Sequence, residues 1–206
     1  MNNNVNIAVL VSGGGTNLQA LINAQNNGII TSGEIRLVVS SNKNAYALKR
    51  AENAGIKTVV CERKGFSQQD FEKNILNALE KEKIEVIVLA GFMSILSADF
   101  VKRYPERIIN VHPSLIPSFC GEGFYGLRVH KAALDYGVKV TGATVHFVNE
   151  IPDGGRIIMQ KAVEIKENDT PEILQKRVME NAEWIILPAA AEKVCKEIKE
   201  RKNERI

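Results

Sequence analysis

The apolar residues in the first half of the chain form short runs that alternate with stretches of helical spacing. Several of these runs are apolar at nearly every position, which is typical of strands buried on both faces of a sheet. Five strands are predicted: Val5–Val11, Ile35–Ser40, Lys57–Cys61, Glu85–Ala90 and Arg107–Val111. Three helices are predicted between them: Asn17–Asn27, Asn44–Ala54 and Ser67–Lys83. This alternation predicts a parallel sheet with right-handed crossovers and helices on both faces.

The pattern changes after residue 112. The expected elements are a loop, a helix and two strands: Leu115–Gly126, Leu127–Asp135, Lys139–Val148 and Arg156–Ile165. Thr170 followed by Pro171 is a favourable start for a last, long helix. The sequence therefore predicts an α/β fold with a doubly wound, mostly parallel sheet, a C-terminal strand pair and a long terminal helix. We expect a single domain over residues 1–206.

Composition narrows the class of protein without identifying a ligand. The 206 residues are 45% apolar and 25% charged, as in ordinary globular proteins. The net charge is +3 and no uninterrupted basic stripe is present, so no nucleic-acid partner is expected. The N-terminus has no signal-peptide pattern, and no apolar run approaches the about 20 residues that span a bilayer. Three dispersed cysteines favour a reducing cytoplasm over a disulfide framework or a zinc site.

A glycine-rich segment, Ser12-Gly13-Gly14-Gly15-Thr16-Asn17, joins the first predicted strand to the first helix. Glycines let backbone N–H groups approach an anion, and a helix N-terminus adds unsatisfied donors and a positive dipole end. The spacing matches neither a dinucleotide fingerprint, because Leu18 stands at the last glycine position, nor a P-loop, because no lysine follows. Two interpretations stay open: a site for one terminal phosphate group, or a tight turn without a ligand.

Asn110 and His112 lie at the end of the fifth predicted strand, which Pro113 terminates. Residues two apart on a strand face the same side, and ligands of open parallel sheets bind at the carboxyl ends of the strands. An amide that donates a hydrogen bond and a ring that titrates near neutral pH suit a reaction that passes through an oxyanion. A lone histidine would more often be structural, but the asparagine on the same face favours a catalytic pair.

Asp153 lies in the segment Ile151-Pro152-Asp153-Gly154-Gly155, for which an ordinary turn is the default interpretation. If the strand Lys139–Val148 runs parallel to Arg107–Val111, this loop opens beside His112. A carboxylate at that place would raise the pKa of His112 above about 6.5 and favour a protonated ring. A protonated ring could then stabilise developing negative charge.

The two other histidines carry less information. His146 lies in an alternating strand and is expected to be structural, and His130 lies on a predicted helix and is expected to be exposed. The three histidines lack the spacing of a metal site, so no metal is expected. No Gly-x-Ser-x-Gly motif supports a hydrolase triad.

Five segments in this order carry a resemblance to a known family: 8–20, 89–93, 110–117, 142–148 and 153–155. The chain resembles the phosphoribosylglycinamide formyltransferases, which are folate-dependent enzymes of purine synthesis, from about residue 5 to residue 190. The sequence Asn-x-His-Pro-Ser-Leu-x-Pro with a downstream Asp-Gly-Gly marks the wider formyltransferase family. The start Ser-Gly-x-Gly-[Ser/Thr]-Asn-Leu-Gln narrows the resemblance to the enzymes that act on glycinamide ribonucleotide.

The resemblance implies a formyl transfer from the co-substrate 10-formyltetrahydrofolate to the amine of 5-phosphoribosylglycinamide through a tetrahedral intermediate. Residues 1–100 would form the phosphate-binding half and residues 101–206 the folate and catalytic half. The implied catalytic residues are Asn110, which donates to the oxyanion, protonated His112, which stabilises it and shuttles a proton, and Asp153, which orients His112 and raises its pKa. The implied substrate-binding residues are Gly14, Gly15, Thr16, Asn17 and Glu183. The implied folate-binding residues are Gln68, Met93, Ser94, Ile95, Leu96, Asn110, Asn149, Glu150, Ile151 and Pro152. A cytoplasmic monomer or homodimer without metal, nucleic acid or membrane partner is expected.

Several positions depart from the pattern of this family. Ser94 stands where many relatives have arginine, and Gln68 stands where a basic residue often contacts the folate, so folate binding could be weaker. One extra residue is present near Glu183. Phe119-Cys120-Gly121 replaces Phe-Pro-Gly, and the insertion-like residues 122–126 follow, so the contacts of this loop are open.

Three alternatives to a glycinamide ribonucleotide formyltransferase are open. Formyltetrahydrofolate deformylase normally carries an N-terminal regulatory domain, and methionyl-tRNA formyltransferase a C-terminal nucleic-acid-binding domain; neither is expected here. A non-enzymatic protein that binds a phosphate ligand would explain Gly13–Asn17. It would not need Asn110, His112 and Asp153 together, and it ranks last.

Overall fold

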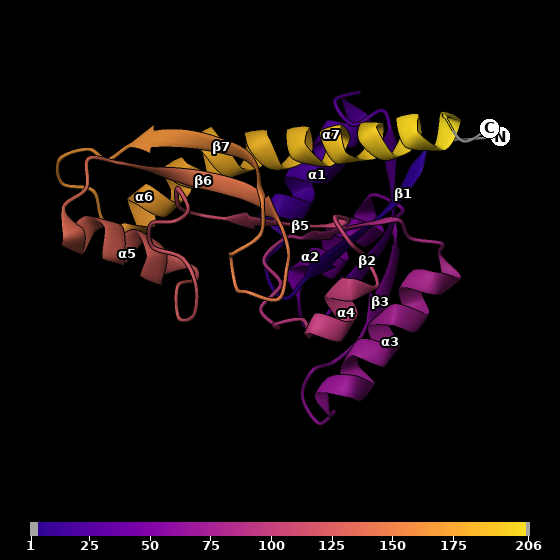
Figure 1. The fold of residues 1–206 in the computed structure, drawn as a ribbon. Helices are drawn as coiled ribbons and strands as arrows, with labels where there is room; N and C mark the ends of the chain where they lie inside the picture. Colours follow the sequence, from indigo (N-terminus) through magenta and orange to yellow (C-terminus); the bar gives the residue numbers. More distant parts are fainter. Residues whose placement is uncertain (1–3, 205–206) are drawn as a thin grey trace.

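A seven-stranded sheet forms the centre of the protein, as Figure 1 shows for the computed structural model, which describes residues 4–204. The order of the strands is β3-β2-β1-β4-β5-β6-β7. They are β1 (Val5–Val11), β2 (Gly33–Ser40), β3 (Lys57–Val60), β4 (Val86–Leu89), β5 (Ile108–His112), β6 (Val140–Phe147) and β7 (Ile157–Glu164). The first five are parallel, and β6 and β7 are antiparallel to their neighbours. This confirms the predicted doubly wound, mostly parallel sheet. The single domain over residues 1–206 stays a prediction.

Helices cover both faces of the sheet. They are α1 (Thr16–Asn26), α2 (Tyr46–Asn53), α3 (Gln68–Lys81), α4 (Ala98–Lys102), α5 (Leu127–Tyr136), α6 (Pro171–Val178) and α7 (Trp184–Asn203). Apolar residues of α1, α2, α6 and α7 pack on one face, and those of α3 and α4 pack on the other. Along β1, Val9 belongs to the first cluster and Leu10 to the second, and both are fully buried. Burial on both faces explains why these strands are apolar at nearly every position.

Helix starts follow the side chains that cap them. The Ser67 hydroxyl accepts the Asp70 N–H at 3.1 Å and begins α3, and Thr170 accepts the Ile173 N–H at 3.3 Å and begins α6, with Pro171 in the first turn. Both starts were predicted, and both satisfy N–H groups that have no partner inside the helix. The short helix α4 was not predicted, although Ser97 caps it in the same way.

The terminal helix is less regular than expected. A π-helical turn, η1 (Met179–Glu183), separates α6 from α7, and Pro188 lies inside α7. A π turn bonds each residue one position further along than an α turn, so it takes up one extra residue, and such turns are frequent at functional sites. The turn therefore provides a place for the extra residue that the sequence carries near Glu183.

Candidate active site

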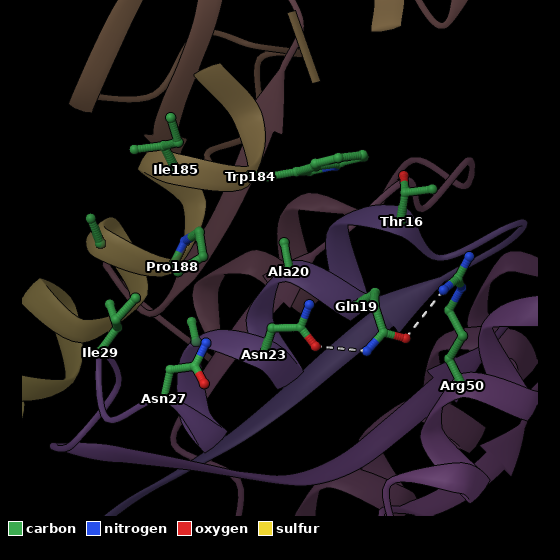
Figure 2. Close-up of a pocket in the computed structure, with 12 residues that line it drawn as sticks. Thr16, Gln19, Ala20, Asn23, Asn27, Ile29, Arg50, Trp184, Ile185 and Pro188 are labelled. Atoms are coloured by element: carbon green, nitrogen blue, oxygen red, sulfur yellow. Dashed lines mark hydrogen bonds between the residues drawn. The ribbon is translucent and has the colours of Figure 1, made fainter. Parts of the chain in front are cut away.

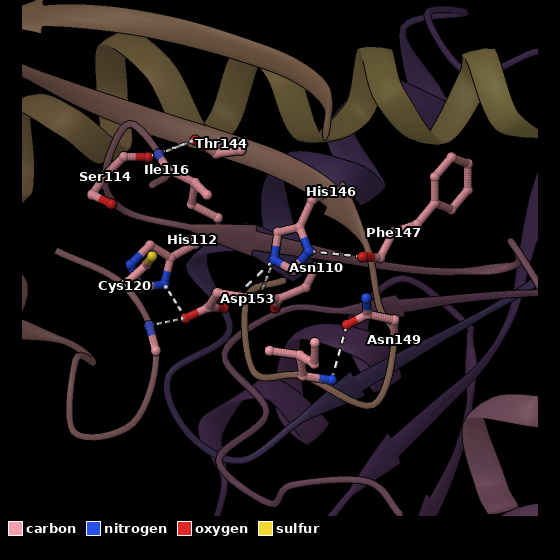
Figure 3. Close-up of polar contacts among 12 residues, drawn as sticks. Asn110, His112, Ser114, Ile116, Cys120, Thr144, His146, Phe147, Asn149 and Asp153 are labelled. Carbon is pink, nitrogen blue, oxygen red and sulfur yellow. Dashed lines mark hydrogen bonds and ion pairs between the residues drawn. The ribbon is translucent and has the colours of Figure 1, made fainter. Parts of the chain in front are cut away.

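Asn110 and His112 lie on one face of β5, as predicted, just beyond the helices that cover it. Ile108, two residues earlier on the same face, packs in the cluster formed by α3 and α4. Asn110 is half-buried and His112 is only 4% exposed. The loops that follow β5 and β6 bring Phe119 and Asp153 to His112, and Figure 3 shows Asp153 beside this ring.

Asp153 joins them, but by a different route from the one predicted. β6 runs antiparallel to β5, so the loop after β6 begins beside the start of β5, where the Val148 N–H donates to the Ile108 carbonyl at 2.9 Å. The loop then returns over the face of the strand and brings Asp153 Oδ2 to 3.4 Å from His112 Nδ1. The condition of parallel strands was wrong, and the convergence of Asp153 and His112 is nevertheless present.

Local backbone geometry lets the loop return. A Cβ at Gly155 would lie 1.7 Å from the Phe147 carbonyl oxygen, so only glycine fits there. Asp153 itself has a φ of 55°, in the left-handed region that few residues other than glycine adopt. The Gly121 N–H donates to Asp153 Oδ2 at 2.9 Å and holds the carboxylate from the other side. The Asp-Gly-Gly sequence thus serves both a tight turn and the placement of a charged group.

His112 has a partner on each ring nitrogen. Nδ1 faces Asp153, and Nε2 lies 2.9 Å from the Phe119 carbonyl, to which it donates because a carbonyl oxygen only accepts. Burial lowers the pKa of His112 below its usual value, and the Asp153 carboxylate and the Phe119 carbonyl oppose only part of this effect. The expected rise in the pKa is therefore wrong for the chain without ligands, because the cost of burying the charged ring is the larger cause.

Asp153 is held in its charged form. Burial raises the pKa of this carboxyl group, but the His146 ring 3.5 Å from its Oδ1, the Gly121 N–H and the nearby His112 lower it further, and the net shift is downward. The carboxylate is 13% exposed. A buried, charged carboxylate beside an uncharged imidazole can stabilise that ring as soon as it takes up a proton.

His146, which was expected to be structural, is a further member of this polar cluster. It lies opposite Asn110 in the register of β5 and β6, and its Nε2 is 3.2 Å from Asn110 Nδ2 and 3.5 Å from Asp153 Oδ1. An antiparallel pairing of these strands would have been the signal for this contact, because directly paired residues share a face.

His130, expected to be exposed, is fully buried on α5, and neither ring nitrogen has a hydrogen-bond partner. Burial, together with the nearby His112, lowers its pKa to about 4. The expectation that His130 is exposed took account only of its polar ring and its place on a predicted helix. Its ring instead lies on the buried face of α5 with Val129 and Ala133.

The glycine-rich segment forms the turn between β1 and α1. A Cβ on Gly15, which has a φ of +73°, would lie 2.6 Å from the Ala47 Cβ, so the turn packs directly on α2. The Ala47 N–H donates to the Gly13 carbonyl at 3.0 Å, and Arg50 Nε donates to the Gly14 carbonyl at 2.8 Å. These bonds occupy carbonyl oxygens, and the first N–H groups of α1 have no partner within the helix. The geometry of the turn suits an anion, and it is also explained by the packing of the turn on α2.

Glu183 lies against this turn. Its Oε2 accepts a hydrogen bond from Asn17 Nδ2 at 2.7 Å, while Asn17 Oδ1 is buried without a partner. Burial raises the pKa of Glu183, and the bond from Asn17 opposes this. The structure thus brings together two residues predicted to bind substrate that are 166 positions apart in the chain.

The segments predicted to bind folate lie in two loops. Met93 and Ile95 are 60% and 71% exposed, and Ile151 in the loop after β6 is 61% exposed. Leu96 differs, because it is buried in the cluster of α3 and α4. Gln68 donates to the Ile95 carbonyl at 3.0 Å and so ties α3 to the first loop.

The other predicted folate residues complete these loops. Ser94 is half-buried, and Glu150 and Pro152 are exposed. Asn149 Oδ1 accepts the Ile151 N–H at 3.0 Å and shapes the second loop. The Met93 N–H donates to Ser12 Oγ at 2.9 Å, which connects the first loop to the glycine-rich turn.

A cavity of about 550 Å³ lies between α1 and α7 (Figure 2), and Asn110, His112 and Asp153 are not among the residues that line it. Trp184, Ile185 and Pro188 form one wall, and Ala20 and Asn23 belong to the other. Thr16 is the predicted site residue that borders it. Catalysis is better placed at Asn110, His112 and Asp153, because the polar groups converge there.

Within residues 4–204, no three His, Cys, Asp or Glu side chains gather as a metal site would require. Within the same limits, none of the helices is both long and apolar enough to cross a bilayer.

Comparison with known proteins agrees with the resemblance found in the sequence. Residues 5–190 match the family described as formyl transferase. The chain is 48% identical over 194 residues to the trifunctional purine biosynthetic protein adenosine-3 of Gallus gallus, which covers 94% of this chain and 19% of that protein. It is 41% identical over 183 residues to the phosphoribosylglycinamide formyltransferase of Haemophilus influenzae, which covers 88% and 83% of the two chains.

A solved structure agrees in fold as well as in sequence. The crystal structure of glycinamide ribonucleotide transformylase 1 from Symbiobacterium toebii matches with a TM-score of 0.88 and 36% identity, over 96% of this chain and 90% of that one. The chain spans about a fifth of the trifunctional relative and most of the bacterial ones. By sequence and fold, the chain belongs to the formyl transferase family.

Proposed function

We propose that this chain transfers the formyl group of 10-formyltetrahydrofolate to the amine of 5-phosphoribosylglycinamide in purine biosynthesis. The observation that carries the proposal is the convergence of Asn110, His112 and Asp153 at the end of β5 in a member of this family. The names of the relatives from Haemophilus influenzae and Symbiobacterium toebii support the choice of acceptor.

The phosphorylated acceptor would bind along the start of α1. The N–H groups of Gly14–Asn17 would receive the phosphate, since the carbonyl groups of Gly13 and Gly14 are already bonded to α2. Glu183 would accept hydrogen bonds from the sugar hydroxyls, and the unpartnered Asn17 Oδ1 offers a second acceptor beside it. The phosphate of the phosphoribosyl group would thus meet hydrogen-bond donors, and its sugar hydroxyls would meet hydrogen-bond acceptors.

The side chains of the two loops beside the catalytic cluster are suited to bind a folate. Met93, Ile95 and Ile151 expose apolar side chains in the two loops next to the cluster, and a flat ring system would cover apolar surface of this kind. Ser94, Leu96, Asn149, Glu150 and Pro152 would complete the two loops that hold it, and Gln68 on α3 would support the first loop through the Ile95 carbonyl. The folate would supply the formyl carbon. Neither Gln68 nor Ser94 carries a charge for an acidic tail.

The catalytic steps follow from the neutral state of His112. As the amine attacks, the Asn110 amide would donate to the formyl oxygen, where negative charge develops. Nδ1 of His112, which holds the lone pair because Nε2 donates to Phe119, would take the proton that the amine loses, and Asp153 would stabilise the resulting positive ring. Collapse of the tetrahedral intermediate would then break the bond between the formyl carbon and the donor nitrogen, and that nitrogen would take up the proton from His112 as it leaves. Asp153 therefore acts on the ring once it is charged, which agrees with a low pKa for His112 before the reaction.

An assay of the purified protein with 10-formyltetrahydrofolate, with and without the acceptor amine, tests this function. Loss of the donor that requires the acceptor and yields the formylated amine is expected. Equal donor loss without the acceptor would instead identify a hydrolase. Binding of the acceptor with no donor loss would identify a protein that only binds phosphate ligands.

A further inference from the structure

We propose that His146 is a positioning residue that fixes the orientation of the Asn110 amide. The inference rests on the proposed function, because Asn110 is the group that donates to the formyl oxygen there. His146 is 2% exposed and lies directly opposite Asn110 in the pairing of β5 with β6. Asn110 Nδ2 is 3.2 Å from His146 Nε2, as Figure 3 shows.

The backbone of β6 determines which nitrogen of His146 carries the proton. His146 Nδ1 lies 2.8 Å from the carbonyl oxygen of Phe147. A carbonyl oxygen only accepts, so Nδ1 must be the donor, and the uncharged ring then has its lone pair on Nε2. The protein thus selects the tautomer in which Nε2 is an acceptor.

That tautomer leaves one orientation for the Asn110 amide. Its nitrogen must face His146 Nε2, because the amide oxygen would place one lone pair against another. One N–H of the amide then bonds to the ring, and its second N–H stays available for the formyl oxygen. Without His146 the amide could turn over and present its oxygen, which would repel the negative charge that develops.

Asp153 is the second neighbour of the same nitrogen. Its Oδ1 lies 3.5 Å from Nε2, which is longer than the usual 2.7–3.2 Å of a hydrogen bond and longer than the 3.2 Å to Asn110. Nε2 can accept a hydrogen bond from Asn110 when it carries a lone pair, or donate one to Asp153 when the ring is charged, but it cannot do both at once. The uncharged ring therefore serves the amide.

Two substitutions separate positioning from support of the backbone. His146→Asn keeps a short amide that can donate to the Phe147 carbonyl but has no atom that reaches Asn110. His146→Gln places an amide oxygen near the position of Nε2, where it can accept from Asn110. Each is measured in the parent and in Asn110→Ala, with kcat, KM for both substrates and the midpoint of thermal unfolding.

The expected result is a fall in kcat of about tenfold or more for His146→Asn, below the about 10²–10³-fold that one oxyanion donor supplies. KM and the unfolding midpoint should change little, and His146→Gln should keep kcat within about fivefold. In the Asn110→Ala background, His146→Asn should cause no further loss, because its effect passes through the amide.

A loss in kcat for His146→Asn that persists undiminished in the Asn110→Ala background would overturn the inference. A folded His146→Gln variant as slow as Asn110→Ala would overturn it as well, so the test stands even if His146→Asn does not fold. ¹⁵N NMR of the histidine rings tests the tautomer without any activity: protonation at Nδ1 is expected for His146, and a neutral ring protonated at Nε2 contradicts it. A parent protein with the Nδ1 tautomer but no formyl transfer would count against the proposed function alone.

Discussion

The glycine-rich turn and the catalytic cluster are built in opposite ways. The turn is contiguous in sequence, and the next helix in the chain, α2, supplies Ala47 and Arg50 to hold it. The cluster takes two side chains from β5, one from β6 and one from the loop after β6, and it exists only when the two strands pair in one register. The turn therefore depends on local backbone shape, and the cluster depends on long-range pairing and on burial of charge. If each serves a different step, changes in the cluster should act on kcat and changes around the turn on substrate binding or stability.

His112→Ala should have the largest effect. We expect kcat to fall about 10²–10⁴-fold, the usual contribution of a general acid or base, while binding of the phosphorylated acceptor is retained. Steady-state kinetics and calorimetric binding of the acceptor measure the two quantities. Unchanged turnover would remove His112 from the reaction, and lost binding would show that turn and cluster are not separate.

Asp153→Asn should act on the same step through the charge beside the ring. Burial already lowers the pKa of His112, and Asp153 raises it, so losing this charge should lower the pKa further. Since the neutral ring takes the proton, activity falls as the pH drops through this pKa, and that acidic limb should move to lower pH. The value of kcat should also fall, by about tenfold or more, because the charged ring loses its partner. A pH profile of kcat/KM with an unmoved acidic limb would exclude Asp153 from this role.

Gly15→Ala tests the packing of the turn. A Cβ there would lie 2.6 Å from the Ala47 Cβ, at a φ of +73°, so we expect a loss of about 1–3 kcal/mol in the free energy of unfolding. Gly13→Ala is the matched control, because nothing lies within 4 Å of its Cβ. Chemical denaturation of both variants gives the comparison. Equal stability of the two would show that the turn can move away from α2.

Glu183→Gln should have the smallest effect. The Gln oxygen can still accept from Asn17, so stability should be kept, but hydrogen bonds from the sugar to an uncharged amide are about half as strong. We expect KM for the acceptor to rise about tenfold with kcat nearly unchanged. A fall in kcat at constant KM would instead indicate that Glu183 acts in the catalytic step and not in binding the acceptor.

The sequence predicted the five parallel strands and the helix starts at Ser67 and Thr170 because each depends on a short, contiguous pattern. It also grouped Asn110, His112 and Asp153, two of them by strand periodicity. It could not give the direction of β6, since alternation looks the same in both directions, and the role of His146 was missed for that reason. The buried state of His130 and the lowered pKa of His112 depend on what packs around each ring, which no local pattern records.

The π turn at Met179–Glu183 has a consequence for how the length of this chain can vary. It sets the rotation of α7 about its axis relative to α6, and Glu183 stands at the last residue before α7. The five residues of the turn cover about the angle that four residues cover in an α-helix, so deleting one of them would give an ordinary helix whose flanking segments keep nearly the same rotation. The apolar faces of α6 and α7 would stay aligned, and only the backbone of the turn beside Glu183 would change. A change in length that would shift the register of an ordinary helix is therefore absorbed at this turn.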